Sequence, residues 1–332
     1  MCFSINRFKT VLLSVTFVFA NTAVANTDTS EVTEAKVQWL KAEKSYLLTQ
    51  SEALLTSLQN YRSLANSYCL APDMASLSSL KTAWQNSYQQ WLVFDGLGLG
   101  PLQDLRNVWL MSYFPDKKDQ VGRQLTHALA EPNTSQSLNA VQSNLRAHEA
   151  LLFDEKFAQQ RCEILPFAAT KLEQSAFALD AAWKDWAVKL SYNQDAQRSI
   201  LASYRAQLGW MRKKMQLVVN EKNQSLKPML SESWRSQQST QMLRVQSQLF
   251  VERSNALFFK YALDNQSPEL EQHSRVLLQN MVSALPQGTI QNTSFEQWIN
   301  LLDHTDIAYV EVEQQWAKAQ GLAIGFNNND GD

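Results

Sequence analysis

The sequence predicts an all-α fold in which two antiparallel helical bundles pack together. Only 9 glycines and 8 prolines occur in 332 residues, and these residue types most often interrupt helices. The sequence lacks runs in which valine, isoleucine or threonine alternate with polar residues, as they do in strands. Long stretches instead repeat apolar residues at the spacing of one helix face.

The first two predicted helices carry this pattern clearly. Thr29 or Ser30 can cap a helix that runs to about residue 68, and Pro72 ends it. Its apolar stripe consists of Val37, Leu40, Tyr46, Leu47, Leu54 and Leu58. The second helix covers about residues 74–94, and its aromatic stripe consists of Leu80, Trp84, Tyr88 and Trp91. We interpret this stripe as core rather than as a haem or stacking site, because bundles bury such stripes.

The later helices follow a break that is rich in glycine. Gly96, Gly98 and Gly100 do not follow a strand, so they do not form the phosphate-binding turn of a dinucleotide site. The remaining predicted helices span residues 120–130, 135–153, 163–191, 196–220, 240–263, 268–284 and 294–320. A domain boundary near residues 223–228 predicts one bundle at 26–225 and a second bundle with an ordered tail at 226–332.

Residues 1–25 are predicted to be a cleaved export signal. Arg7 and Lys9 precede an apolar run over residues 11–20, and Ala23-Val24-Ala25 supplies the small residues that signal peptidase recognises. The run is shorter than the roughly 20 residues that a permanent membrane anchor needs. The sequence therefore predicts a periplasmic protein with no membrane span after cleavage.

Charge and motif content exclude several classes of function. Removal of residues 1–25 leaves 28 basic residues against 32 acidic ones, a formal net charge of −4. Since no segment concentrates basic residues, nucleic acid is not expected as a partner. No His-Glu-x-x-His stretch and no Gly-x-Ser-x-Gly turn occur, so neither a zincin mechanism nor a serine nucleophile is indicated.

The cysteines indicate a disulfide. Cys2 lies in the predicted signal, which leaves Cys69 and Cys162. Two separate buried thiols are the alternative, but we favour a structural bridge because the periplasm is oxidising.

Four blocks of residues resemble the imelysin-like family of periplasmic proteins. They are Phe114–Lys118 with Gly122-Arg123-Gln124 after it, Arg146–Phe153, Trp234-Arg235-Ser236, and Gly325–Asp332. The resemblance implies a helical fold of two bundle-like domains and, for many relatives, a context in iron acquisition. It also implies a metallopeptidase activity for some relatives.

The chain departs from the family's Gly-x-His-x-x-Glu signature. Glu149 matches the glutamate, but Arg146 stands at the histidine position and Asn144 at the glycine position. A histidine and a glutamate at this spacing share a helix face and can bind one metal ion. An arginine has no lone pair to donate, so it is expected to form a salt bridge with Glu149 instead. A metal ion such as iron on Glu149 and His148 would need ligands from another helix.

The polar residues of these blocks are the candidate binding residues. They are Asp116, Lys117, Arg123, Arg146, Glu149, Trp234 and Arg235. Around Asp116 the cationic side chains could line a site for an anion such as a metal chelate, or could form ion pairs that fix a loop. We interpret the protein as a non-catalytic periplasmic binding or accessory protein whose partner is an iron-uptake component or a metal chelate. The alternative is a metal-dependent peptidase of the imelysin type.

Overall fold

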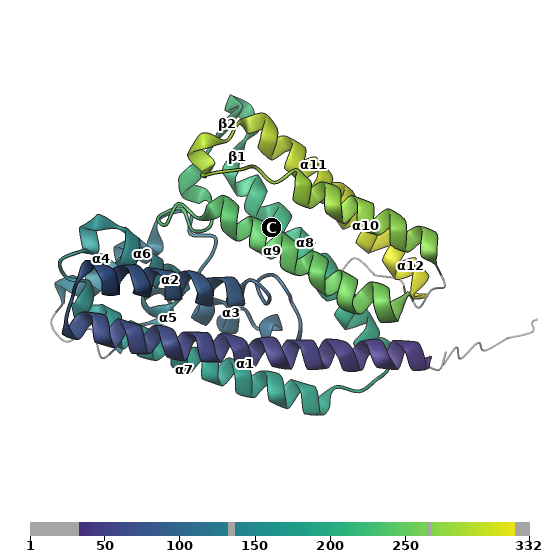
Figure 1. Cartoon of the computed structure of the whole chain (residues 1–332), viewed down its shortest axis with the longest axis horizontal. Coiled ribbons are helices and arrows are strands. Elements are labelled where there is room, and N and C mark those ends of the chain that lie inside the picture. Colours follow the sequence, from purple (N-terminus) through teal and green to yellow (C-terminus); the bar gives the residue numbers. More distant parts are fainter. Residues whose placement is uncertain (1–32, 132–136, 264–266, 323–332) are drawn as a thin grey trace, which may run out of the picture. The chain divides into compact units, whose positions relative to one another are not determined.

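A computed structural model describes residues 33–131, 137–263 and 267–322 of the chain. Figure 1 shows that this part is almost entirely helical, which confirms the predicted all-α class. The predicted export signal and the family-like block at Gly325–Asp332 lie outside the described residues.

The helices before residue 190 pack around the long first helix. α1 (Glu34–Leu70) lies along both α2 (Met74–Trp91) and α7 (Arg161–Lys189). Thr33 caps α1, and Asp73 forms a capping box with Ser76 at the start of α2, so both starts follow from the sequence. Four shorter helices connect α2 to α7: α3 (Leu105–Met111), α4 (Gln120–Ala130), α5 (Ala140–Ser143) and α6 (Leu145–Phe153).

The helices after residue 193 pack mainly on one another. α8 (Gln194–Val218) contacts α9 (Ser239–Arg253) and α11 (Phe295–Glu311), while α10 (Pro268–Ser283) contacts the same two helices. The π-helical segment η6 (Ser254–Ala262) extends α9 and contacts α1, which joins the two groups of helices. The π-helical segment η8 (Val312–Trp316) leads from α11 into α12 (Ala317–Ala319).

Several short elements were not predicted. The helix predicted at 135–153 is interrupted at Asn144, whose side chain accepts from the backbone N–H groups of Arg146 and Ala147 and so starts α6. Two short strands, β1 (Val219–Asn220) and β2 (Ser225–Leu226), pair antiparallel, and α3 is also additional. The 3₁₀ segments are Gly100–Gln103, Glu155–Phe157, Glu221–Asn223, Pro228–Leu230 and Ile290–Asn292.

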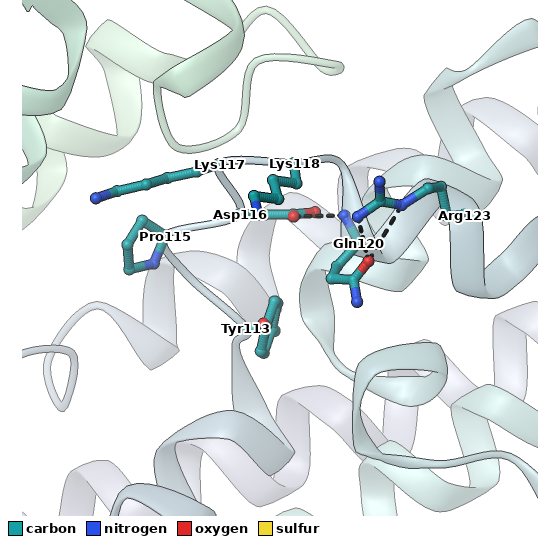
Figure 2. Close-up of a pocket in the computed structure, with 7 residues that line it drawn as sticks. All are labelled: Tyr113, Pro115, Asp116, Lys117, Lys118, Gln120 and Arg123. Atoms are coloured by element: carbon teal, nitrogen blue, oxygen red, sulfur yellow. Dashed lines mark hydrogen bonds between the residues drawn. The ribbon is translucent and has the colours of Figure 1, made fainter.

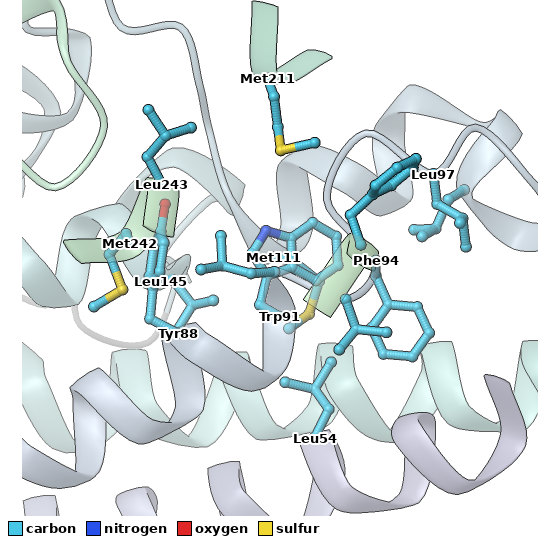
Figure 3. Packing of buried hydrophobic residues seen from close by; sticks show 14 of the residues in the cluster. Leu54, Tyr88, Trp91, Phe94, Leu97, Met111, Leu145, Met211, Met242 and Leu243 are labelled. Carbon is cyan, nitrogen blue, oxygen red and sulfur yellow. The ribbon is translucent and has the colours of Figure 1, made fainter. Parts of the chain in front are cut away.

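The aromatic stripe of α2 lies in the core, as predicted. Trp84, Tyr88 and Trp91 are each 0% exposed. Figure 3 shows Trp91 among side chains that come from elements on both sides of residue 190, including Met111 of α3 and Met211 of α8. One continuous hydrophobic core therefore includes both groups of helices, and the predicted domain boundary near residue 225 stays a prediction.

The predicted disulfide is present between Cys69 and Cys162, with Cα atoms 5.3 Å apart. It joins the end of α1 to the start of α7, so the two helices run antiparallel. In the described part of the chain, no helix is both long and apolar enough to cross a membrane.

Candidate functional site

Arg146 and Glu149 form the predicted ion pair on α6. Arg146 Nη1 lies 2.7 Å from Glu149 Oε2, and the two side chains are only 2% and 0% exposed. The contact is close but is not aligned as a hydrogen bond. Burial would lower the pKa of Arg146, but the nearby acidic groups, led by Glu149, raise it above its ordinary value. Arg146 therefore stays protonated, and its contact with Glu149 stabilises the pair inside the protein.

The second carboxylate oxygen of Glu149 binds the third family-like block. Glu149 Oε1 accepts hydrogen bonds from the backbone N–H of Ser236 at 2.9 Å and from its hydroxyl at 3.0 Å. Ser236 lies in a turn in which Ser233 and Gln237 have φ values of 55° and 58°, a backbone conformation that is uncommon for residues other than glycine. The turn thus brings the N–H of Ser236 to a carboxylate whose other oxygen already faces Arg146.

Arg235 connects the same turn to the first family-like block. Its guanidinium forms an ion pair with Asp119 and lies 3.5 Å from Asp154 Oδ2. It also lies over the ring of Trp234, 4.3 Å from the ring centre. Asp119 in turn caps α4 by accepting from Gly122 N–H at 3.1 Å. Three blocks that are far apart in the sequence therefore meet at Glu149 and Arg235.

A pocket of about 520 Å³ lies beside these contacts. Figure 2 shows its lining, which consists of Tyr113, Pro115, Asp116, Lys117, Lys118, Gln120 and Arg123. Asp116 accepts from the backbone N–H groups of Gln120 at 2.5 Å and of Val121 at 3.0 Å, so it helps to cap α4. Asp116, Lys117 and Arg123 thus line one pocket, and their role in binding stays a prediction.

His148 faces away from the carboxylate beside it. Its Nδ1 lies 2.8 Å from the hydroxyl of Tyr61 in α1, and the two rings meet edge to face. Within the described residues, no group of three or more His, Cys, Asp or Glu side chains is arranged to hold a metal ion. Because Glu149 is shared between Arg146 and Ser236, this donor set does not fit a metal ion as it is arranged. The assignment of a metal to Glu149 and His148 stays a prediction.

A family model for imelysin matches residues 43–248, which cover well over half of the chain and contain all three blocks that meet at the site. The chain belongs to the imelysin family.

No match was found among curated proteins. Solved structures with this fold include the following two. An imelysin-like protein from Psychrobacter arcticum 273-4 has a TM-score of 0.73 at 14% identity, over 88% of this chain and 98% of its own. A protein from Parabacteroides distasonis ATCC 8503, provisionally named iron-regulated protein A precursor, has a TM-score of 0.70 at 12% identity, over 88% and 97%.

The imelysin chain contains a second buried charge network, which the sequence analysis missed. Lys214 of α8 forms ion pairs with Asp95 and Glu232, and its Nζ lies 2.5 Å from Glu232 Oε2. The Tyr88 hydroxyl donates to Glu232 Oε1 at 2.6 Å. Burial would lower the pKa of Lys214, but Asp95 and Glu232 raise it above its ordinary value. The sequence does hold a signal for this network, because Lys214 lies on the same face of α8 as buried Met211 and Val218.

A third buried network lies between α1 and the end of α9. Arg253 Nε lies 3.1 Å from Glu43 Oε2, and Arg253 also donates to Gln207 and Ser203 of α8. The Tyr204 hydroxyl donates to the other oxygen of Glu43. Glu43 lies on the apolar stripe formed by Leu40 and Leu47. An acidic residue on an apolar helix face was therefore the signal in the sequence that could have indicated this buried network.

Burial of His148 predicts that stability depends on pH. Burial lowers its pKa from 6.5 to about 4. Between these pH values the unfolded chain binds a proton at His148 that the folded chain does not bind. The contribution of the neutral His148 to the free energy of unfolding is therefore fully present above about pH 6.5 and falls as the pH drops towards 4. We expect the loss to reach about 3 kcal/mol, measured by urea unfolding at several pH values.

Two variants test the origin of this pH dependence. His148→Gln should flatten the slope between pH 6.5 and 4, whereas His127→Gln, at a largely exposed histidine of α4, should leave the slope as it is. Equal slopes in the wild type and His148→Gln would show that His148 is not the cause.

Proposed function

We propose that this protein is a non-catalytic binding or accessory protein of the periplasm that acts in iron uptake. The observation that carries the proposal is the state of Glu149, one oxygen of which faces the guanidinium of Arg146 while the other accepts from Ser236. A carboxylate held in this way braces the structure and is poorly available to a metal ion or a reacting water. The chemistry of the buried site thus favours a structural role for Glu149 over a catalytic one.

Iron enters the proposal through the relatives. One of the solved structures with this fold is provisionally named for iron regulation and as a precursor, and the predicted signal at residues 1–25 supports export. A binding protein for iron compounds would also use the cationic pocket beside the site, since carboxylate chelates of iron carry negative charge.

Growth of a deletion strain tests this function. Without the gene, growth should slow in iron-depleted medium and stay normal in iron-replete medium, and the full gene should restore it. A gene that lacks codons 2–25 should fail to restore growth, because its product would not be exported. Equal growth of the parent and the deletion strain under iron depletion would contradict the proposal.

A metal-dependent peptidase is the competing function, since the family includes proteins of that class. It requires a bound metal ion and cleavage that a chelator abolishes. Metal analysis of the purified protein and of the double variant Arg146→Met/Glu149→Gln, combined with a peptide-cleavage assay, separates the two functions. One metal ion per chain that is lost in the double variant, together with chelator-sensitive cleavage, would overturn the non-catalytic proposal.

A further inference from the structure

In the pocket beside α4, the acidic and the basic side chains differ in whether the protein supplies them with partners. Both acidic residues of its loop have partners, because Asp116 accepts from two backbone N–H groups and Asp119 forms an ion pair with Arg235. Lys117, Lys118 and Arg123 are exposed and form no ion pair with any residue that the structure describes. The pocket therefore presents cationic groups whose charges the protein itself does not neutralise.

The surroundings of the pocket hold part of its lining in place. The ring of Phe114, which directly precedes Pro115 of the lining, packs against the guanidinium of Arg146, 5.8 Å from the ring centre, and the charge of Arg146 is itself paired with Glu149. Gln120 orients Arg123 by accepting from its Nε at 3.1 Å and from its Nη2. An anion in the pocket would thus meet a positioned guanidinium and two exposed ammonium groups.

The spread of the basic side chains indicates the kind of anion. Figure 2 shows the side chain of Lys117 on one side of Asp116 and that of Arg123 on the other. A single phosphate presents all its oxygens around one atom, whereas a molecule with several carboxylates presents them at separate points and still fits a volume of about 520 Å³.

We propose that this pocket binds a small polycarboxylate, with Arg123 pairing with one carboxylate and Lys117 and Lys118 with the others. The ligand could be the free acid or its complex with ferric iron, since both present carboxylate oxygens. Only the link to iron rests on the proposed function, because binding of the free acid requires nothing but the pocket.

Isothermal titration calorimetry of the mature protein with citrate tests the proposal, with ferric citrate and inorganic phosphate as parallel ligands. Citrate should bind more tightly than phosphate, and binding should weaken as the ionic strength rises. Lys117→Ala and Arg123→Ala should each raise the citrate Kd about tenfold. Lys318→Ala is the matched control, because it removes an exposed lysine of α12 that does not line the pocket.

The outcomes separate this proposal from the function in iron uptake. Binding of citrate or ferric citrate that weakens in the pocket variants and not in Lys318→Ala supports the site and identifies which form it takes. No binding of either ligand would overturn it, as would phosphate binding as tight as citrate binding or equal effects of all three substitutions. If citrate binds but the deletion strain grows normally without iron, the site stands and the role in iron uptake fails.

Discussion

Replacement of Glu149 by glutamine is expected to lower the free energy of unfolding by about 3–5 kcal/mol, because it leaves the guanidinium of Arg146 charged and buried without its partner. The glutamine can still accept from the N–H of Ser236, so the loss reports mainly on the charge. Arg146→Met should be similarly destabilising, since it leaves the carboxylate of Glu149 unpaired. Urea unfolding of the purified variants measures both effects.

A double variant distinguishes a lost charge from lost packing. Arg146→Met/Glu149→Gln removes both charges, so it should be less destabilised than either single variant. Arg198→Met is the matched surface control, because Arg198 pairs with Asp195 at the same helical spacing while exposed, and it should cost less than about 1 kcal/mol. If Arg146→Met costs no more than Arg198→Met, the buried pair does not stabilise the protein as argued.

Removal of the disulfide should have a comparable effect. In the double variant Cys69→Ala/Cys162→Ala the unfolded chain gains the freedom of a loop of 93 residues, which the chain-entropy model values at about 4–5 kcal/mol. The urea midpoint and the melting temperature should both fall.

The wild type provides the control for the disulfide. Treatment with a reducing agent should lower its stability to that of the cysteine variant, and the variant should not respond to the agent. Unfolding free energies of the oxidised wild type and the variant that agree within the error of extrapolation would contradict a stabilising role for the bridge.

Much of the fold could be predicted because its signals are local. Pro72 and Asp73 end one helix and start the next, and the spacing of Arg146 and Glu149 on one helix is sufficient to predict their pairing. The interruption at Asn144 was missed because the apolar pattern continues across it, although asparagine is a good helix cap. α3 was missed because it is short and leaves Leu105 and Trp109 exposed, so it carries no clear apolar stripe.

The contacts between the blocks are not local and could not be predicted. Nothing near Ser236 in the sequence indicates that its N–H binds Glu149, because that contact depends on how distant helices pack and on a turn with unusual φ values. The sequence analysis predicted the pair of Arg146 and Glu149 within one block, but not which residues of different blocks touch.

The three buried charge networks share one feature that constrains how the molecule can move. In each, charged or polar groups from before residue 190, such as Glu43, Asp95 and Glu149, meet partners from after residue 193, such as Arg253, Lys214 and Ser236. If one helix group opened about a hinge or slid along the other, several of these charged groups would lose their partners at once while still buried in an apolar interior. We therefore expect the two helix groups to resist separation, so that a ligand of the proposed pocket would exchange at the protein surface.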